Sequence, residues 1–154
     1  MNAKAFIATL GLFFAGIGLC LAADANLGTW KLNEAKSTLT SGAPKNTTVV
    51  YTAVGDQVKV TVDGVDKDGK PTHSEWTGKY DGKDYAVTGD PSSDARAAKK
   101  VDDNTLELTV KKGGSTTSSG SIVVSADGKS RTVTLKGKDS AGKEFTSKAV
   151  YDKQ

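Results

Sequence analysis

The sequence predicts an all-β protein, an antiparallel up-and-down meander of about ten strands closed into a barrel. Turn signals rich in glycine, aspartate and asparagine recur at short intervals from residue 54 to residue 143. These residues tolerate the positive φ angles that tight hairpins require. Between the turns, apolar and polar residues alternate. A long meander has two unpaired edges, and pairing the first strand with the last removes both of them.

The alternation has the period of two that is typical of a half-buried strand. Val58, Val60 and Val62 share one face of their segment, and the residues between them are polar. Residues 105–112 and 130–138 repeat this pattern. The intervals between turns leave no room for a crossover helix, which excludes a parallel sheet of βαβ units.

We therefore expect strands at 27–33, 46–54, 57–63, 72–80, 84–88, 94–101, 105–112, 115–125, 130–138 and 143–152. Residues 94–100 have the composition of a helical turn, but both neighbouring segments are strands, so we predict a strand there. Residues 115–121 are polar on both faces, which predicts a strand that lines a wet interior or frays into a loop. The longest connection, 33–45, is expected to cross one mouth of the barrel.

Residues 1–23 have the layout of a secretory signal peptide. Lys4 precedes an uncharged apolar run over 5–21, and small residues follow it. Cleavage after Ala23 or after Ala25 would fit this pattern. The alternative is an uncleaved anchor helix, since the run approaches the length that spans a bilayer.

Cys20 is the only cysteine of the chain and lies inside this leader. A lipoprotein signal requires a small residue just before the cysteine, and Leu19 occupies that position. We therefore expect a secreted or periplasmic protein without a lipid anchor at Cys20. After cleavage the chain would have neither a thiol nor a transmembrane segment.

Residues 24–154 have the length of a single domain. The whole chain contains 21 basic and 18 acidic residues, and they are interspersed along the predicted strands. Such a distribution indicates a solvated surface, whereas a nucleic-acid site needs a concentrated basic patch. We expect a monomer that does not bind nucleic acid.

At the first predicted strand the chain reads Gly28-Thr29-Trp30, and here it resembles the calycins, which comprise the lipocalins and fatty-acid-binding proteins. Both groups open with a Gly-x-Trp element whose indole closes one end of the barrel. Residues 24–154 resemble more closely a bacterial family of small exported lipocalin-like proteins without an established activity. The shared motifs are GTWKLN, VDGxDxDGKP, KYDGKDYxVTG and VYDKQ.

Three departures from the calycin pattern affect what the resemblance implies. The connection 33–45 is too short for the helix-turn-helix lid of the fatty-acid-binding proteins. Their Arg-x-Tyr pair on the last strand corresponds to Ala149 and Tyr151, so the arginine is missing. Lipocalins place an arginine from a late strand beside the tryptophan of Gly-x-Trp, and Arg131 is the candidate for that position.

A barrel can hold a ligand, so we expect a non-catalytic binding protein for a small hydrophobic or amphipathic molecule. Trp76, Tyr85 and Tyr151 can contact a ligand with their rings and hydrogen-bond with their polar tips. Arg96 and Arg131 are the only arginines, and an inward arginine can pair an anionic head group. The alternative roles are core packing for the aromatic residues and an exposed or stacked position for the arginines.

Two rival functions start from other features. In one, the barrel is filled by its own side chains and serves as a scaffold for an envelope interaction through loops 33–45 or 88–94. In the other, His73 or Glu75 supports catalysis, although no nucleophile motif accompanies them. We expect no cofactor and no metal, since the acidic turn at 66–69 lacks the first ligand of a calcium loop, where Gly64 stands.

Overall fold

The computed structural model describes residues 24–40, 43–138 and 142–154. The predicted signal peptide and Cys20 lie outside the described residues. The strands are β1 (Gly28–Leu32), β2 (Lys45–Val54), β3 (Gln57–Val65), β4 (Pro71–Gly78), β5 (Asp81–Thr88), β6 (Ala95–Lys100), β7 (Thr105–Lys112), β8 (Ser115–Val124), β9 (Ser130–Lys138) and β10 (Glu144–Lys153). A single turn of 3-10 helix, η1 (Glu34–Lys36), follows β1.

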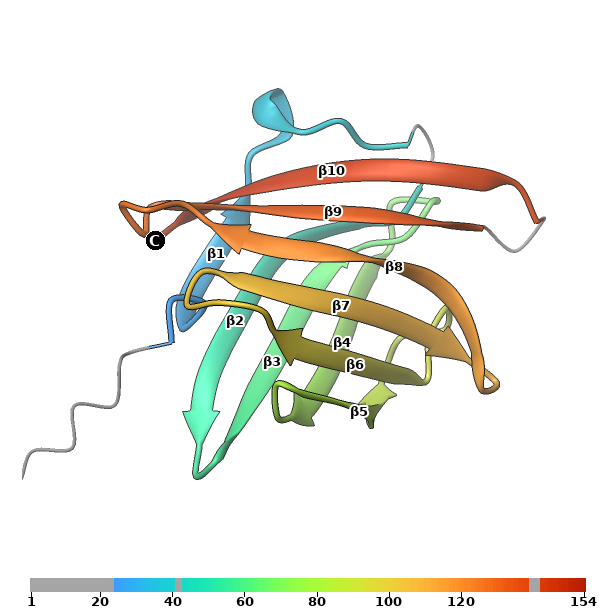
Figure 1. Ribbon diagram of the computed structural model, residues 1–154. Helices are drawn as coiled ribbons and strands as arrows, with labels where there is room; N and C mark the ends of the chain where they lie inside the picture. The colour runs from blue at the N-terminus through green and yellow to red at the C-terminus, as the bar shows by residue number, and fades with distance from the viewer. Residues whose placement is uncertain (1–23, 41–42, 139–141) are drawn as a thin grey trace, which may run out of the picture.

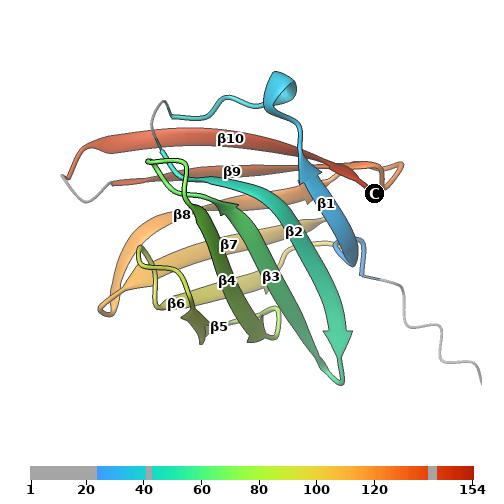
Figure 2. The same cartoon turned by 180° about the vertical axis from the view of Figure 1, so that it is seen from behind.

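The strands form a closed antiparallel barrel, as the sequence predicted (Figures 1 and 2). Consecutive strands pair from β2 to β10, and β1 pairs with both β2 and β10. The closing seam places Trp30 opposite Lys153 on one side and opposite Val49 on the other. The barrel is of the lipocalin and fatty-acid-binding-protein type, and the described residues between β1 and β2 form no helical lid.

Two segments with ambiguous composition are strands. Residues 95–100 pair along their whole length with β7, so the alanines of this segment adopt the extended backbone of their neighbours. The polar segment 115–121 belongs to β8 and pairs with β7 and β9. β5 begins at Asp81, earlier than the predicted residue 84, because a register shift between Asp81 and Asp84 lets Asp81 pair with Lys99.

The connection between β1 and β2 does not cross the mouth over its described first part. Thr38 forms a bridge with Lys148, and each donates its backbone N–H to the carbonyl of the other. The hydroxyl of Ser37 accepts from the backbone N–H of Val150 at 2.9 Å. The segment therefore follows β10 along the wall, where β10 extends beyond the short β1 (Figure 1).

The two ends of the barrel differ in burial. One end of the barrel is formed by residues 24–27 and by the hairpins β2–β3, β4–β5, β6–β7 and β8–β9, and we call it the closed end. The other end, formed by the remaining connections, is the open end. Near the closed end Trp30 is 0% exposed, and Val124 and Arg131 are each 2% exposed.

Inward-facing side chains become more exposed toward the open end. On each of three strands, the first inward residue is buried and the next two along the strand are partly exposed. These series are Leu106, Leu108 and Val110 on β7; Arg131, Val133 and Leu135 on β9; and Tyr151, Ala149 and Ser147 on β10. Solvent therefore reaches the inner wall of the barrel from the open end along β7, β9 and β10.

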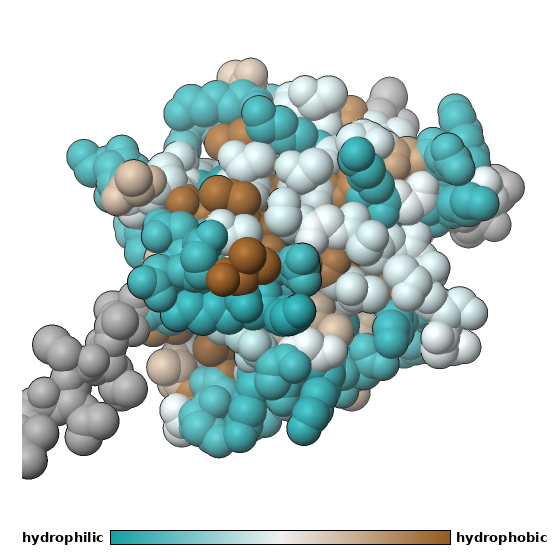
Figure 3. Space-filling view, in the orientation of Figure 1, coloured by the Kyte–Doolittle hydropathy of each residue, from teal (hydrophilic) through white to brown (hydrophobic). Residues whose placement is uncertain are grey.

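The outer surface is mainly hydrophilic. Figure 3 shows polar side chains over most of the face that β6 to β9 present, with hydrophobic residues in small separate patches. Large hydrophobic residues exposed in the described part of the chain are Val54, Val101 and Val123. The main apolar surface of the barrel therefore faces inward, around a core built on Trp30, Tyr51, Val60 and Trp76.

One join in the barrel wall is short. β4 and β5 pair only at Glu75 with Thr88 and at Trp76 with Val87. Inside this join the rings of Trp76 and Tyr85 meet edge to face, with centroids 6.0 Å apart and an interplanar angle of 84°. Side-chain packing thus supplies cohesion where the backbone ladder is short.

The wall also brings backbones too close for a side chain at Gly120 of β8. A Cβ atom there would lie 1.8 Å from the carbonyl oxygen of Thr134. We predict that Gly120→Ala lowers the free energy of unfolding by about 1–3 kcal/mol, as overpacking does. Urea unfolding followed by circular dichroism measures this change. Ser119→Ala, at the exposed neighbouring position, should change stability by less than about 0.5 kcal/mol. Equal stability of the two variants would contradict the close approach.

Candidate functional site

The interior contains a small pocket with a free volume of about 40 Å³. That volume holds a few water molecules, since one water requires roughly 10–15 Å³. The walls come from both halves of the barrel and are mostly apolar or aromatic. They are formed by Tyr51, Val60, Trp76, Tyr80, Arg96, Ala98, Leu106, Leu108 and Ile122.

Trp76 forms the centre of one wall and connects three strands. Its indole Nε1 donates to the carbonyl oxygen of Arg96 at 3.2 Å, which joins β4 to β6 beneath β5. Its ring packs against Tyr85 of β5, whose hydroxyl donates to Asp81 at 3.0 Å. Loss of solvent contact, followed by this bond to the Asp81 carboxylate, raises the pKa of Tyr85.

Arg96 lies between the pocket and the open end. Its Nη2 donates to the carboxylate of Asp90 at 2.9 Å, while Nε is buried and has no partner among the described residues. Burial raises the pKa of Asp90, but hydrogen bonds from Ser92 and Ser93 and the charge of Arg96 outweigh it and lower that pKa overall. The β5–β6 connection, through Asp90, therefore holds Arg96 near the open end of the barrel.

Arg131 is enclosed by three aromatic rings at the closed end. Its Cζ lies 4.7 Å from the ring centroid of Tyr51, 4.9 Å from that of Tyr151 and 5.1 Å from that of Trp30. We call these four residues the arginine cage. The position beside Trp30 is the one that the calycin resemblance implied for Arg131. Its Nε and Nη1 are buried and donate to no atom of the described residues.

A chain of hydrogen bonds seals the closed end below the arginine cage. The indole Nε1 of Trp30 donates to the carbonyl oxygen of Asn26 at 2.7 Å. Asn26 in turn donates its backbone N–H to Asp24 at 2.9 Å, and the hydroxyl of Tyr80 donates to the same carboxylate at 2.8 Å. Burial raises the pKa of Tyr80 well above its usual range, so the hydroxyl keeps the proton that it donates.

The five predicted ligand-contact residues all lie on the inner face of the barrel. Tyr85 pairs with Arg96, Arg131 pairs with Tyr151, and Trp76 pairs with the buried Val87. Trp76 and Arg96 line the pocket, and Tyr85 packs behind Trp76. Arg131 and Tyr151 belong to the arginine cage instead. Contact of any of the five with a ligand stays a prediction. The sequence did not single out Tyr51 and Tyr80, although the alternation of β2 places Tyr51 on the same face as the buried Val49.

His73 lies on the outer wall, on the face of β4 opposite to the buried Ser74 and Trp76. Its Nδ1 lies 2.7 Å from the carboxylate of Asp63, and 58% of the side chain is exposed. The hydrogen bond to Asp63 raises the pKa of His73, and Glu75 adds to this effect. Glu75 itself pairs with Lys59 at 2.8 Å. Neither residue borders the interior pocket, and no cluster of metal-binding side chains occurs in residues 24–40, 43–138 and 142–154.

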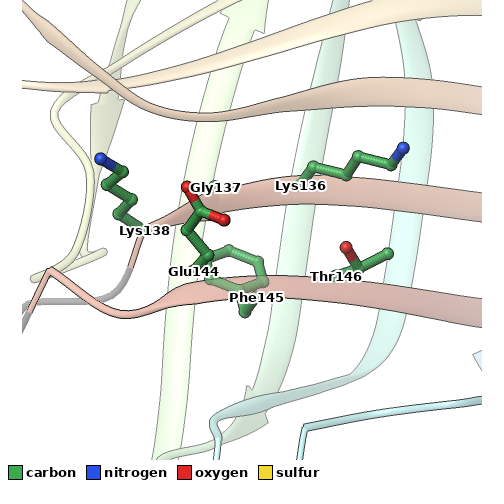
Figure 4. Close-up of a pocket in the computed structure, with 6 residues that line it drawn as sticks. All are labelled: Lys136, Gly137, Lys138, Glu144, Phe145 and Thr146. Carbon is green, nitrogen blue, oxygen red and sulfur yellow. The ribbon is translucent and has the colours of Figure 1, made fainter.

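A larger depression of about 440 Å³ lies where β9 and β10 approach their hairpin, away from the pocket beside Trp76. Figure 4 shows the residues that line it on these two strands: Lys136, Gly137, Lys138, Glu144, Phe145 and Thr146. The depression is open to solvent and adjoins residues 139–141, which are outside the described residues. We therefore place the candidate site in the interior.

Comparison with known proteins gave matches at the level of structure. No protein-family profile matches the chain, and no curated protein matches it. One similar solved structure is EF1p2_mFAP2b bound to DFHBI, with 15% identity and a TM-score of 0.48, covering 86% of this chain and 97% of that chain. Another is a redesigned β-barrel, mFAP1, bound to DFHBI, with 17% identity and a TM-score of 0.44, covering 86% and 98%. In the described part of this chain, no helix has the length and hydrophobicity to cross a membrane.

The hydrogen bond between Tyr80 and Asp24 yields a test of the closed end. We predict that Tyr80→Phe lowers the free energy of unfolding by about 1 kcal/mol, because the partly buried Asp24 carboxylate loses a donor. Chemical denaturation measures this change. Tyr85→Phe is the matched control, since the hydroxyl of Tyr85 bonds to Asp81 at an exposed position, and its cost should be smaller. An unchanged stability of Tyr80→Phe would show that Asp24 does not seal this end.

Proposed function

We propose that the protein is an exported, non-catalytic binding protein that holds a small hydrophobic or amphipathic molecule inside the barrel. The observation that carries the proposal is the position of Leu108. This residue lines the interior pocket and is also partly exposed, at the start of the solvent-reached inner wall. The pocket and the open end thus share a wall, so a ligand that enters from the open end can reach Trp76.

The size of the pocket defines how such a ligand would lie. Ligand sites commonly have roughly 300–1,000 Å³, and the free volume here is about 40 Å³. One end of the ligand would therefore occupy the pocket beside Trp76, and the rest would lie along the inner wall of the open end. Each methylene that leaves water contributes about 0.8 kcal/mol, so the apolar residues of β7 and β9 favour a hydrocarbon or aromatic ligand.

The small free volume also favours the rival function. A barrel filled by its own side chains would act as a scaffold and bind a partner through its loops. The connection that contains Asp90 is a candidate for such a contact, because its turn is ordered by Ser92, Ser93 and Arg96. The two functions predict different results when the interior pocket is filled. Ligand binding inside the barrel would be lost, whereas partner binding through the loops would be unchanged.

We predict that Ala98→Leu weakens ligand binding at least tenfold. Ala98 is 3% exposed and lines the pocket, so a larger side chain would occupy the space beside Trp76. Binding is measured with a neutral fluorescent probe, N-phenyl-1-naphthylamine. Ala53→Leu makes the same substitution at an exposed position of β2 and should bind the probe like the original protein. Equal probe binding by both variants would contradict an interior site.

Native mass spectrometry of the protein purified from its own host provides the complementary test. The proposal expects an additional mass from a noncovalently bound small molecule, which Ala98→Leu reduces. A protein that carries no such mass and does not bind the neutral probe would support the scaffold function instead.

A further inference from the structure

We infer that the outer wall of β9 and β10 binds a polysaccharide that carries anionic groups. This site is separate from the interior pocket and goes beyond the proposed function. It consists of outward side chains near the end of the two strands that leads to their hairpin, and we call it the lysine face. Its members are Thr134, Lys136 and Lys138 on β9 and Glu144, Thr146 and Lys148 on β10.

The register of the two strands brings the three lysines of this face together. Lys136 and Lys138 lie two residues apart on one strand, which separates their Cα atoms by about 7 Å. Lys148 is a diagonal neighbour of Lys136, because Lys136 lies opposite Thr146, and such neighbours are roughly 7–8 Å apart. Figure 4 shows the side chains of Lys136, Lys138 and Glu144 rising from the same side of the two strands.

The lysines of this face lack the acidic partners that several other outward lysines have. Lys59 pairs with Glu75 at 2.8 Å, and Lys111 pairs with Asp84 at 2.7 Å. The side chains of the three lysines on this face form neither an ion pair nor a hydrogen bond within residues 24–40, 43–138 and 142–154. Three lysines and one glutamate therefore give the face a formal charge of +2.

The neighbouring strands do not supply the missing acid. The row that contains Lys148 continues through Thr134 of β9 and Ser121 of β8 to Glu107 of β7. Three strand spacings separate Glu107 from Lys148, a distance of about 14 Å. Exposed charges that far apart are largely screened, since the Debye length is about 8 Å at physiological ionic strength. The lysine face thus keeps an excess of positive charge that favours an anionic partner.

The residues between and beside the lysines suit a sugar chain. Thr134 and Thr146 belong to the face, and Ser119 and Ser121 of β8 extend its rows. The hydroxyls of these four residues make no hydrogen bond within the described part of the chain. A hydroxyl both donates and accepts, whereas an ammonium group only donates. The combination can therefore bind the hydroxyls of a sugar as well as its anionic groups.

The shape of this region also fits a ligand. Lys136, Lys138, Glu144 and Thr146 border the depression of about 440 Å³ described above. Its volume falls within the range of roughly 300–1,000 Å³ that is common for ligand sites. A sugar unit could thus sit in a hollow between the lysines instead of resting on a flat wall.

A bilayer and a nucleic acid match this face less well. Proteins that lie on a bilayer insert apolar side chains among the lipids. The large hydrophobic residues exposed in the described part of the chain are Val54, Val101 and Val123, and none of them belongs to the lysine face. Single-stranded nucleic acids stack their bases on aromatic side chains, and the outward residues of this face include none.

Dextran and dextran sulfate have the same backbone and differ in charge, so this pair tests the inference. We expect the protein to bind fluorescein-labelled dextran sulfate at least tenfold more tightly than labelled dextran, as measured by fluorescence anisotropy at low salt. Equal affinity for the two polymers, or no binding of dextran sulfate, would overturn the inference. An equal or higher affinity for phosphatidylglycerol vesicles or for a DNA duplex would overturn the choice of a polysaccharide.

Matched variants locate the site. A variant that combines Lys136→Gln, Lys138→Gln and Lys148→Gln should bind dextran sulfate at least fivefold more weakly. The control replaces three lysines that are paired with acids, namely Lys59, Lys79 and Lys111, by glutamine. It has the same net charge and should bind within about twofold of the original protein. An equal loss in both variants would show that binding follows net charge alone and would overturn the assignment to this face.

A second pair of variants tests the hydroxyls. Thr134→Val combined with Thr146→Val keeps the β-branched shape and should weaken binding of dextran sulfate at least twofold. The control, Thr52→Val combined with Thr77→Val, changes exposed threonines of β2 and β4 and should leave binding unchanged. Equal affinities of the two variants would contradict a role of the hydroxyls.

The interior probe separates this inference from the proposed function. The lysine variant should bind N-phenyl-1-naphthylamine like the original protein, because its substitutions lie on the outer wall. Loss of dextran sulfate binding with probe binding retained would support a separate outer site. Loss of both ligands in the lysine variant would contradict it.

Discussion

The pairing of β1 with β10 is the interaction on which the rest of the structure depends. It joins the first and last strands, removes both sheet edges and creates an inner face that is enclosed at the closed end. Trp30 lies at this seam and is fully buried. Since Arg131 and Tyr151 face each other across β9 and β10 and pack with Trp30, closure of the wall also assembles the arginine cage.

The two ends of the barrel follow from how the inner face is filled. At the closed end, aromatic rings surround a guanidinium and a chain of hydrogen bonds runs from Trp30 through Asn26 to Asp24. Toward the open end the inward residues are alanine, serine, valine and leucine, which leave the inner wall within reach of solvent. The interior therefore changes from a tightly packed, enclosed base to a wall of smaller residues that solvent reaches.

Much of the fold was predictable because alternation and turn signals act locally. The bounds of β7 and β9 agree with the predicted ones, and the period of two places Trp76, Tyr85 and Arg96 on the inner face. The closed-end contacts were not predictable from local pattern. Asp24 lies beside the predicted leader and meets Tyr80 only after the barrel closes. The short join between β4 and β5 and the small pocket volume depend on packing across the barrel, which no single segment of the sequence encodes.

A high-resolution crystal structure of the protein purified from its own host tests the account most directly. The account predicts elongated electron density along the inner wall of β7 and β9, with one end in the pocket beside Trp76. Side chains of the barrel itself filling this region, with no ligand density, would contradict it.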